Sequence, residues 1–172
     1  ISEDAMAYVT AASLKDPTCT RLAPEGFTNL QIMTLVPRSY SIWNVEQGPA
    51  EGGRYHRDPE YRRRKTDVME HLIDAAQLVI PDLREHIAWK EAATPVSQER
   101  FTRSTGGTSY GIEMSCNQAG PLRVGPRTEI PGLFLCGAST PSGPGIAGVM
   151  RGGVATAGEI LEADLLKAVL AG

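Results

Sequence analysis

The chain has 172 residues, 41% of them hydrophobic and 22% charged, which is ordinary for a globular protein with one sizeable core. Its formal net charge is -3, and nucleic acid is not expected as the main partner, because phosphate binding needs a clustered excess of basic charge. No apolar run approaches the roughly 20 residues that span a bilayer, so a transmembrane helix is not expected.

The first residues, Ile1-Ser2-Glu3-Asp4, contain neither an initiator Met nor the basic and apolar regions of a signal peptide. We therefore expect the chain to be a fragment of a longer protein. Cys19, Cys116 and Cys136 are widely spaced and form no C-x-x-C pair, which argues against a disulfide framework and a zinc site. Buried reduced thiols and a cytoplasmic location are expected instead.

The N-terminal part predicts few regular elements. Helical or irregular structure and then a loop are expected up to about Pro24, where turn-forming residues accumulate. Leu, Ile, Val and Thr predominate over Phe27 to Val36, which predicts a strand ending at Pro37. Ser41 to Val45 could form a short second strand. Three glycines and a proline over Gln47 to Gly53 predict a loop.

A long helix is the clearest prediction of the middle region. Asp58 can serve as N-cap because its carboxylate accepts hydrogen bonds from unpaired backbone amides. Pro59 suits the first helical position, and Glu60 complements the positive end of the helix dipole. Pro81 should end the helix. Apolar residues recur at helical spacing between these signals: Val68, Met69, Leu72, Ile73, Ala76, Val79 and Ile80.

Shorter elements are expected after this helix. A strand is predicted around His86 to Ala92, and a short helix is predicted around Ser97 to Arg103, ended by Gly106-Gly107. Ser109 to Gln118 favours no single element. Pro121 to Arg127 is predicted to be a loop.

The last quarter predicts a strand, a glycine-rich loop and a helix. Leu133 to Cys136 is a short apolar run of the kind that forms a strand buried on both faces. The loop covers Gly137 to Gly145, and a helix is expected from about Ile146 to Leu170. Its first half is small and apolar, so we expect it to be buried against a sheet or a ligand.

This arrangement places a helix N-terminus where it can meet a ligand. The first-turn amides lack helical partners and, with the helix dipole, attract anions or electron-rich oxygens. The loop is not a P-loop, because no Gly-Lys-Ser/Thr closes it. Neither Ser139 nor Ser142 lies in a G-x-S-x-G nucleophile elbow, so a hydrolase is not favoured. From the residues alone, two interpretations of this loop remain open. It either binds a ligand or is a connection that merely allows close packing.

The segment Thr128 to Gly137 resembles the second flavin-contact motif of flavoproteins with two dinucleotide-binding motifs. Its continuation through Pro144 to Val149 resembles the C-terminal signature of phytoene desaturases, carotenoid isomerases and retinol-saturase-like proteins. Further upstream, several segments follow the order of that family: Ala23 to Gly26, the strand ending at Val36-Pro37, Thr94-Pro95, and Gly106 to Gly111 with Tyr110.

This resemblance implies FAD as the cofactor. Gly137 and Ala138 would lie against its ribityl and pyrophosphate part, and Gly145, Ile146 and Ala147 would present backbone at the pyrimidine edge of the isoalloxazine. A helix N-terminus there would stabilise negative charge at flavin N1. Tyr110 is the candidate for lining the substrate site, and no catalytic side chain is assigned.

Two departures from the family pattern matter. Ala138 stands where many relatives carry an acid that holds a ribityl hydroxyl. The G-x-G-x-x-G motif that cradles the FAD diphosphate is missing from this chain, so half of the cofactor site is missing with it. The missing N-terminal portion of the FAD domain is therefore an expected partner, and the isolated fragment is expected to be inactive.

The expected parent is an α/β flavoprotein, of which this chain would be an α+β fragment. Residues 1–100 would belong to a substrate domain and residues 101–172 to the C-terminal part of the FAD-binding domain. Hydride would pass between FAD and an apolar, isoprenoid-like small molecule. The alternative is a non-catalytic cofactor- or partner-binding domain on the same scaffold.

Three further expectations concern surfaces and side chains. His56, His71 and His86 lack metal-ligand spacing, so no metal site is expected. The basic run from Arg54 to Lys65 is either a patch for peripheral contact with an anionic membrane or a solvated helix face, and the interrupting acids favour the second. Exposed sheet edges and apolar surface predict self-association of the fragment.

Overall fold

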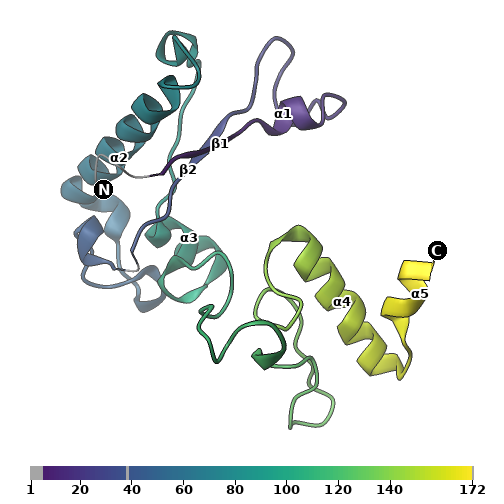
Figure 1. Cartoon of the computed structure of the whole chain (residues 1–172). Coiled ribbons are helices and arrows are strands. Elements are labelled where there is room, and N and C mark those ends of the chain that lie inside the picture. Colours follow the sequence, from purple (N-terminus) through teal and green to yellow (C-terminus); the bar gives the residue numbers. More distant parts are fainter. Residues whose placement is uncertain (1–5, 38, 172) are drawn as a thin grey trace. The chain divides into compact units, whose positions relative to one another are not determined.

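The computed structural model of the protein describes residues 6–37 and 39–171 (Figure 1). The chain divides into two compact units, Ile1–Gly107 and Thr108–Gly172. Within the described residues the structure is a mixture of helices, short 3-10 helices and one two-stranded sheet. The assignment of residues 1–100 to a substrate domain and 101–172 to an FAD domain stays a prediction.

The sheet of the first unit is small. Strand β1 (Tyr8–Thr10) pairs antiparallel with β2 (Gln31–Met33), with Tyr8 opposite Met33. Helix α1 (Ala12–Lys15) lies between them in the sequence. The strand predicted over Phe27 to Val36 is therefore confirmed only at its centre, and β1 was missed.

Helix α2 (Pro59–Gln77) begins where its N-terminal signals predict. One carboxylate oxygen of Asp58 accepts hydrogen bonds from the amides of Glu60, at 2.6 Å, and Tyr61, at 3.1 Å. The helix ends at Gln77, four residues before Pro81, and Leu78 is its C-cap. Pro81 is therefore not the residue that stops it.

The core of the first unit lies between α2 and the turns that precede it. It is formed by Trp43, Val45, Tyr55, Tyr61 and Val96. The short strand expected over Ser41 to Val45 is wrong, because Ser41–Trp43 forms a 3-10 helix. The amides of Trp43 and Val45 both donate to the Tyr40 carbonyl, at 2.9 and 3.1 Å, and so are not free to form a strand ladder.

Helix α3 (Pro95–Thr102) confirms the helix predicted around Ser97 to Arg103. Thr94 and Ser97 form a capping box, in which each side chain binds the backbone amide of the other. The Tyr61 hydroxyl lies 2.9 Å from Thr94 Oγ1 and 3.1 Å from Ser97 Oγ. The start of α3 is thus joined to α2 by a buried polar contact.

The strand predicted around His86 to Ala92 is wrong. Leu83–His86 forms a 3-10 helix, and no residue from 87 to 92 lies in a strand. Trp89 is 77% exposed, and Lys90 Nζ lies 2.6 Å from Glu70 Oε1 on α2. The apolar residues of this segment do not meet a neighbouring strand, so nothing pairs their backbone. The remaining 3-10 helices are Pro49–Glu51, Tyr55–Arg57, Thr105–Gly107 and Gly120–Leu122.

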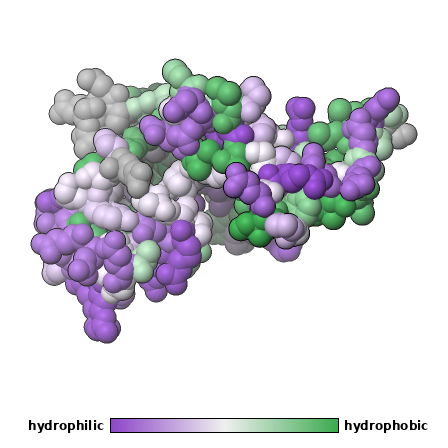
Figure 2. Space-filling model, turned by 90° about the horizontal axis from the view of Figure 1, so that it is seen from below, coloured by the Kyte–Doolittle hydropathy of each residue, from purple (hydrophilic) through white to green (hydrophobic). Residues whose placement is uncertain are grey.

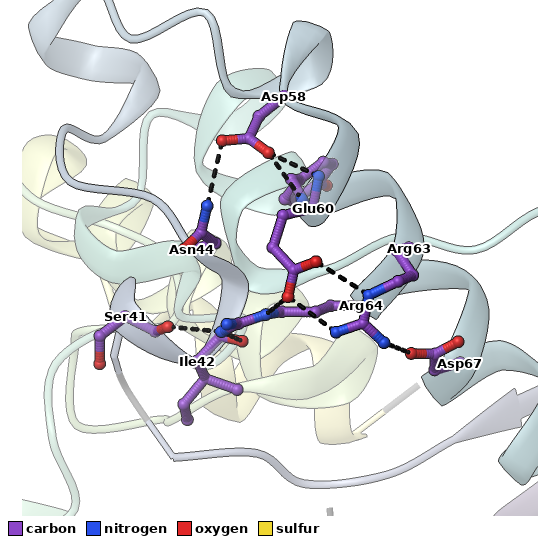
Figure 3. A network of polar contacts seen from close by, with 9 residues as sticks. Ser41, Ile42, Asn44, Asp58, Glu60, Arg63, Arg64 and Asp67 are labelled. Atoms are coloured by element: carbon purple, nitrogen blue, oxygen red, sulfur yellow. Dashed lines mark hydrogen bonds and ion pairs between the residues drawn. The ribbon is translucent and has the colours of Figure 1, made fainter.

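A polar network fixes the start of α2 to the 3-10 helix at Ser41–Trp43 (Figure 3). Glu60 binds Arg63 and Arg64, each with a shortest nitrogen–oxygen distance of 2.7 Å. Arg64 Nη1 also donates to the carbonyls of Ser41, at 2.9 Å, and Ile42, at 2.8 Å. Two arginines of the basic run are therefore held by contacts within the chain.

This network predicts a pH dependence of stability. Hydrogen bonds from Arg63 and Arg64 lower the pKa of Glu60 from 4.5 to about 2. A carboxyl with a lowered folded-state pKa stabilises the fold above its unfolded pKa, and this stabilisation is lost as pH falls through the folded pKa. We therefore expect the thermal midpoint to fall between pH 4.5 and about pH 2, and Glu60→Gln to make this fall shallower.

The control is Glu25→Gln, since Glu25 is an exposed carboxylate of the same unit. Thermal unfolding of the three proteins across the acidic range, followed by circular dichroism, provides the comparison. Some slope should remain in Glu60→Gln, because the amide of Tyr61 also lowers the pKa of Asp58. Parallel curves for Glu60→Gln and the unsubstituted chain would contradict the prediction.

The second unit contains α4 (Gly145–Leu161) and α5 (Leu165–Ala171). The single helix expected from Ile146 to Leu170 is therefore divided. Glu162 adopts a left-handed conformation with φ of 51°, and the Ala163 amide donates to the Gly158 carbonyl at 3.0 Å, which ends α4.

The buried strand predicted for this unit is wrong. Leu133 to Cys136 forms one isolated bridge, between Arg127 and Phe134, in place of a buried strand. Leu133 is 46% exposed and Leu135 is 39% exposed. A strand needs a partner on at least one edge, and the described residues of this unit supply only that bridge. At the start of α4, Ile146 is 82% exposed, so the first turn is not covered within the described residues, and its burial against a ligand stays a prediction.

Candidate functional site

The loop between Cys136 and α4 is ordered by local hydrogen bonds. Thr140 is 3% exposed, and its amide and hydroxyl both donate to the Gly137 carbonyl, at 3.1 and 2.8 Å. The Gly143 amide then donates to the Thr140 carbonyl at 2.9 Å. The loop is thus two successive turns that share Thr140.

Helix α4 holds the segment that leads into this loop. Thr156 is 7% exposed, and its hydroxyl lies 2.9 Å from the Leu135 carbonyl and 2.9 Å from the Gly152 carbonyl. At the far end of the same segment, Arg127 Nε lies 3.1 Å from Glu159 Oε2. These contacts set where the loop lies along the helix.

The N-terminus of α4 has the properties that an electron-rich ligand requires. Pro144 occupies the N-cap position, and no side chain caps the helix. Gly145, Ile146 and Ala147 form its first turn and are exposed, and the first turn contains no acidic residue. Its first amides therefore lack the side-chain acceptor that usually satisfies them.

All five predicted cofactor residues lie in the stretch from Gly137 to Ala147. Gly137 and Ala138 begin the loop and are half-buried, and Gly145, Ile146 and Ala147 begin the helix. At Gly137 and Gly145 no atom lies within 4 Å of where a Cβ would be, so both have open space beside the backbone. An elongated cofactor could approach the backbone there, and the residues present fit such a group. Which atoms they contact stays a prediction.

The Tyr110 segment runs beside the loop. An added Cβ at Gly111 would lie 2.7 Å from Ser139 Oγ, and the Ile112 amide donates to Ser139 Oγ at 3.3 Å. The Tyr110 side chain is 59% exposed. Its role in lining a substrate site stays a prediction.

Sequence reasoning missed Arg123. Its side chain is buried, at 4% exposure, and it binds the carbonyls of Ile112, Ala138 and Ser139. Arg123 stands in a stretch predicted only as a loop, and no local pattern signals that it reaches the backbone 15 residues further along the chain.

The remaining candidates form no second site. Among the described residues, no three His, Cys, Asp or Glu side chains lie close enough to hold a metal ion. The expectation of buried thiols is wrong for Cys116 and Cys136, which are exposed, and Cys19 is half-buried. No helix in the described part of the chain has the length and apolar character to cross a bilayer.

Comparison with known proteins gives relatives that cover nearly the whole chain. It is 30% identical to an inactive all-trans-retinol 13,14-reductase of Danio rerio over 162 residues, which is 91% of this chain and 25% of that protein. It is 29% identical to a lycopene-forming phytoene desaturase of Pantoea ananas over 170 residues, which is 96% of this chain and 30% of the relative.

A third relative is a 4,4'-diaponeurosporene oxygenase of Staphylococcus haemolyticus, 26% identical over 93% of this chain and 28% of its own length. The chain thus spans between a quarter and a third of the curated relatives that it matches. No protein-family model and no solved structure matches the chain.

Proposed function

We propose that this chain, which resembles the C-terminal part of phytoene desaturases and retinol reductases, is the flavin-contact portion of an FAD-dependent oxidoreductase. The parent protein would transfer hydride between FAD and an apolar, isoprenoid-like small molecule. The observation that carries the proposal is the exposed, uncapped start of α4 next to an ordered glycine-rich loop, in a chain whose relatives are desaturases and reductases.

Each part of this stretch has a role in the proposed site. The amides of Gly145, Ile146 and Ala147 would face the pyrimidine edge of the flavin, where negative charge develops on reduction. Gly137 and Ala138 would present backbone to the ribityl and pyrophosphate part. The bound FAD supplies the hydride chemistry, so the chain needs to orient the cofactor and stabilise charge.

Ala138 cannot hold a ribityl hydroxyl as an acid would. We therefore expect weaker binding of FAD, unless backbone or water replaces that contact. The other half of the FAD site would come from the N-terminal portion of the same domain. Residues 1–100 would contribute to the substrate domain, and Tyr110 would line the substrate site. Both are proposals that a structure of the complete protein with FAD would test.

The function is tested with the full-length protein that contains this chain. Purification should yield bound flavin, identified as FAD after release by mass spectrometry. Anaerobic mixing with a saturated or unsaturated isoprenoid should then change the flavin absorbance as hydride is transferred. A full-length protein that neither retains FAD nor binds it on titration would contradict the proposal.

One observation favours the alternative of a non-catalytic binding domain. The Danio rerio relative is named as an inactive reductase, so proteins of this kind include members that are described as lacking activity. The alternative predicts tight binding of oxidised FAD with no hydride transfer to or from any isoprenoid. The anaerobic experiment separates the two functions, because both predict flavin binding and only one predicts turnover.

A further inference from the structure

Arg123 makes four polar contacts although its side chain is only 4% exposed. Nη2 donates to the carbonyls of Ala138, at 2.9 Å, and Ile112, at 3.2 Å. Nε donates to the Ser139 carbonyl at 3.3 Å, and Nη1 lies 2.8 Å from Met114 Sδ. One guanidinium therefore joins the start of the glycine-rich loop to the Ile112–Met114 segment.

The charge of this guanidinium is not neutralised by a neighbour. Across residues 6–37 and 39–171, no carboxylate lies within ion-pair distance of Arg123. Arginine stays protonated in proteins, and burying an unpaired charge is costly unless hydrogen bonds compensate for it. Three carbonyl dipoles provide that compensation here, and they leave the net positive charge in place.

The contacts also fix the backbone that would meet the cofactor. Ala138 and Ser139 are consecutive. Holding both carbonyls therefore sets the orientation of the two successive peptide planes that follow Ala138. The planar guanidinium suits this task because its donors have a rigid arrangement that the ammonium group of lysine lacks. Ser139 Oγ adds a second link by accepting from the Ile112 amide at 3.3 Å.

We infer that Arg123 is the positioning residue of the proposed flavin loop. This inference rests on the proposed function. The peptide orientation that Arg123 holds governs the affinity of this loop for FAD.

The test compares Arg123→Met and Arg123→Lys in the full-length protein, with Arg151→Met as the matched control. Arg151 is an exposed arginine on α4, so its replacement removes the same charge from the same unit. The measurements are hydrogen exchange of residues 111–114 and 137–140 without FAD, and the Kd for FAD.

We expect Arg123→Met to speed exchange in both segments and to raise the Kd for FAD at least tenfold. Arg123→Lys should raise the Kd for FAD less than Arg123→Met does, because its ammonium group can still donate to these carbonyls, although it lacks the planar set of donors. Arg151→Met should leave exchange in both segments and the Kd for FAD as they are in the unsubstituted protein.

Failure of this inference can be distinguished from failure of the proposed function. If the unsubstituted protein binds FAD and Arg123→Met keeps its affinity for FAD, the inference is overturned and the function stands. If the unsubstituted protein does not bind FAD, the function fails, while the exchange measurement still tests whether Arg123 orders the loop. Should Arg123→Met not fold, unchanged hydrogen exchange and unchanged affinity for FAD in Arg123→Lys would overturn the inference.

Discussion

Glu99→Ala is expected to destabilise the N-terminal unit by about 3 kcal/mol, because a buried acceptor of strong hydrogen bonds would be removed. Glu99 lies on α3 and is 3% exposed. Its Oε2 accepts a hydrogen bond from the Tyr40 hydroxyl and another, at 3.0 Å, from the Gly106 amide. The substitution would take away the partner of Gly106 and leave a void between these segments.

Urea unfolding followed by tryptophan fluorescence measures this effect, because Trp43 is buried in the core of the same unit. Glu99→Gln should cost less, since an amide oxygen in the place of Oε2 can still accept both hydrogen bonds, without the charge of the carboxylate. The control is Glu91→Ala, which removes the same carboxylate from an exposed position. Equal unfolding midpoints for Glu99→Ala and Glu91→Ala would show that the buried contacts contribute nothing.

The helices of the first unit were predictable because their signals are local. Asp58, Pro59 and Glu60 mark the start of α2 within three consecutive residues, and Thr94 and Ser97 cap α3 within four. The strands were not predictable in the same way, because a strand depends on a partner elsewhere in the chain. Ser41 to Val45 has the composition of a strand, and a tight turn closed on the Tyr40 carbonyl takes its place.

The same distinction applies to the candidate site. The glycine-rich loop and the start of α4 could be predicted from Gly137 to Ala147 because glycine, proline and helix signals follow one another in the sequence. The side chains that hold this loop could not be predicted, because Arg123 and Thr156 donate hydrogen bonds to backbone carbonyls 15 and 21 residues away. Such contacts depend on the tertiary fold and leave no spacing pattern.

The exposed apolar residues of the second unit bear on the prediction of self-association. The first two turns of α4 expose Ile146 at 82% and Met150 at 67%, and Leu133 and Leu135 are exposed before the loop. Figure 2 shows hydrophobic side chains on the molecular surface beside strongly hydrophilic ones. Apolar surface of this kind is normally covered in a stable protein. Light scattering at rising concentration tests whether copies of the chain cover it, and a monomer throughout would contradict the prediction.

Gly148→Ala is expected to disturb the candidate site strongly. An added Cβ at Gly148 would lie 2.6 Å from the Gly143 carbonyl oxygen and 2.9 Å from that of Ser142. Both atoms are backbone, so neither can move without shifting the loop away from the helix. We expect a loss of about 2 kcal/mol in stability and a Kd for FAD raised at least tenfold in the full-length protein.

Gly153→Ala is the matched control, because the same methyl group on the same helix would meet no atom within 4 Å. Alanine favours the helix over glycine by up to about 1 kcal/mol, so this variant should be as stable as the unsubstituted chain or more stable. Circular dichroism during thermal unfolding gives the two stabilities, and flavin titration gives the two affinities. If Gly148→Ala binds FAD as tightly as Gly153→Ala, the close contact between loop and helix does not shape the cofactor site, and the proposed role of the α4 N-terminus loses its structural support.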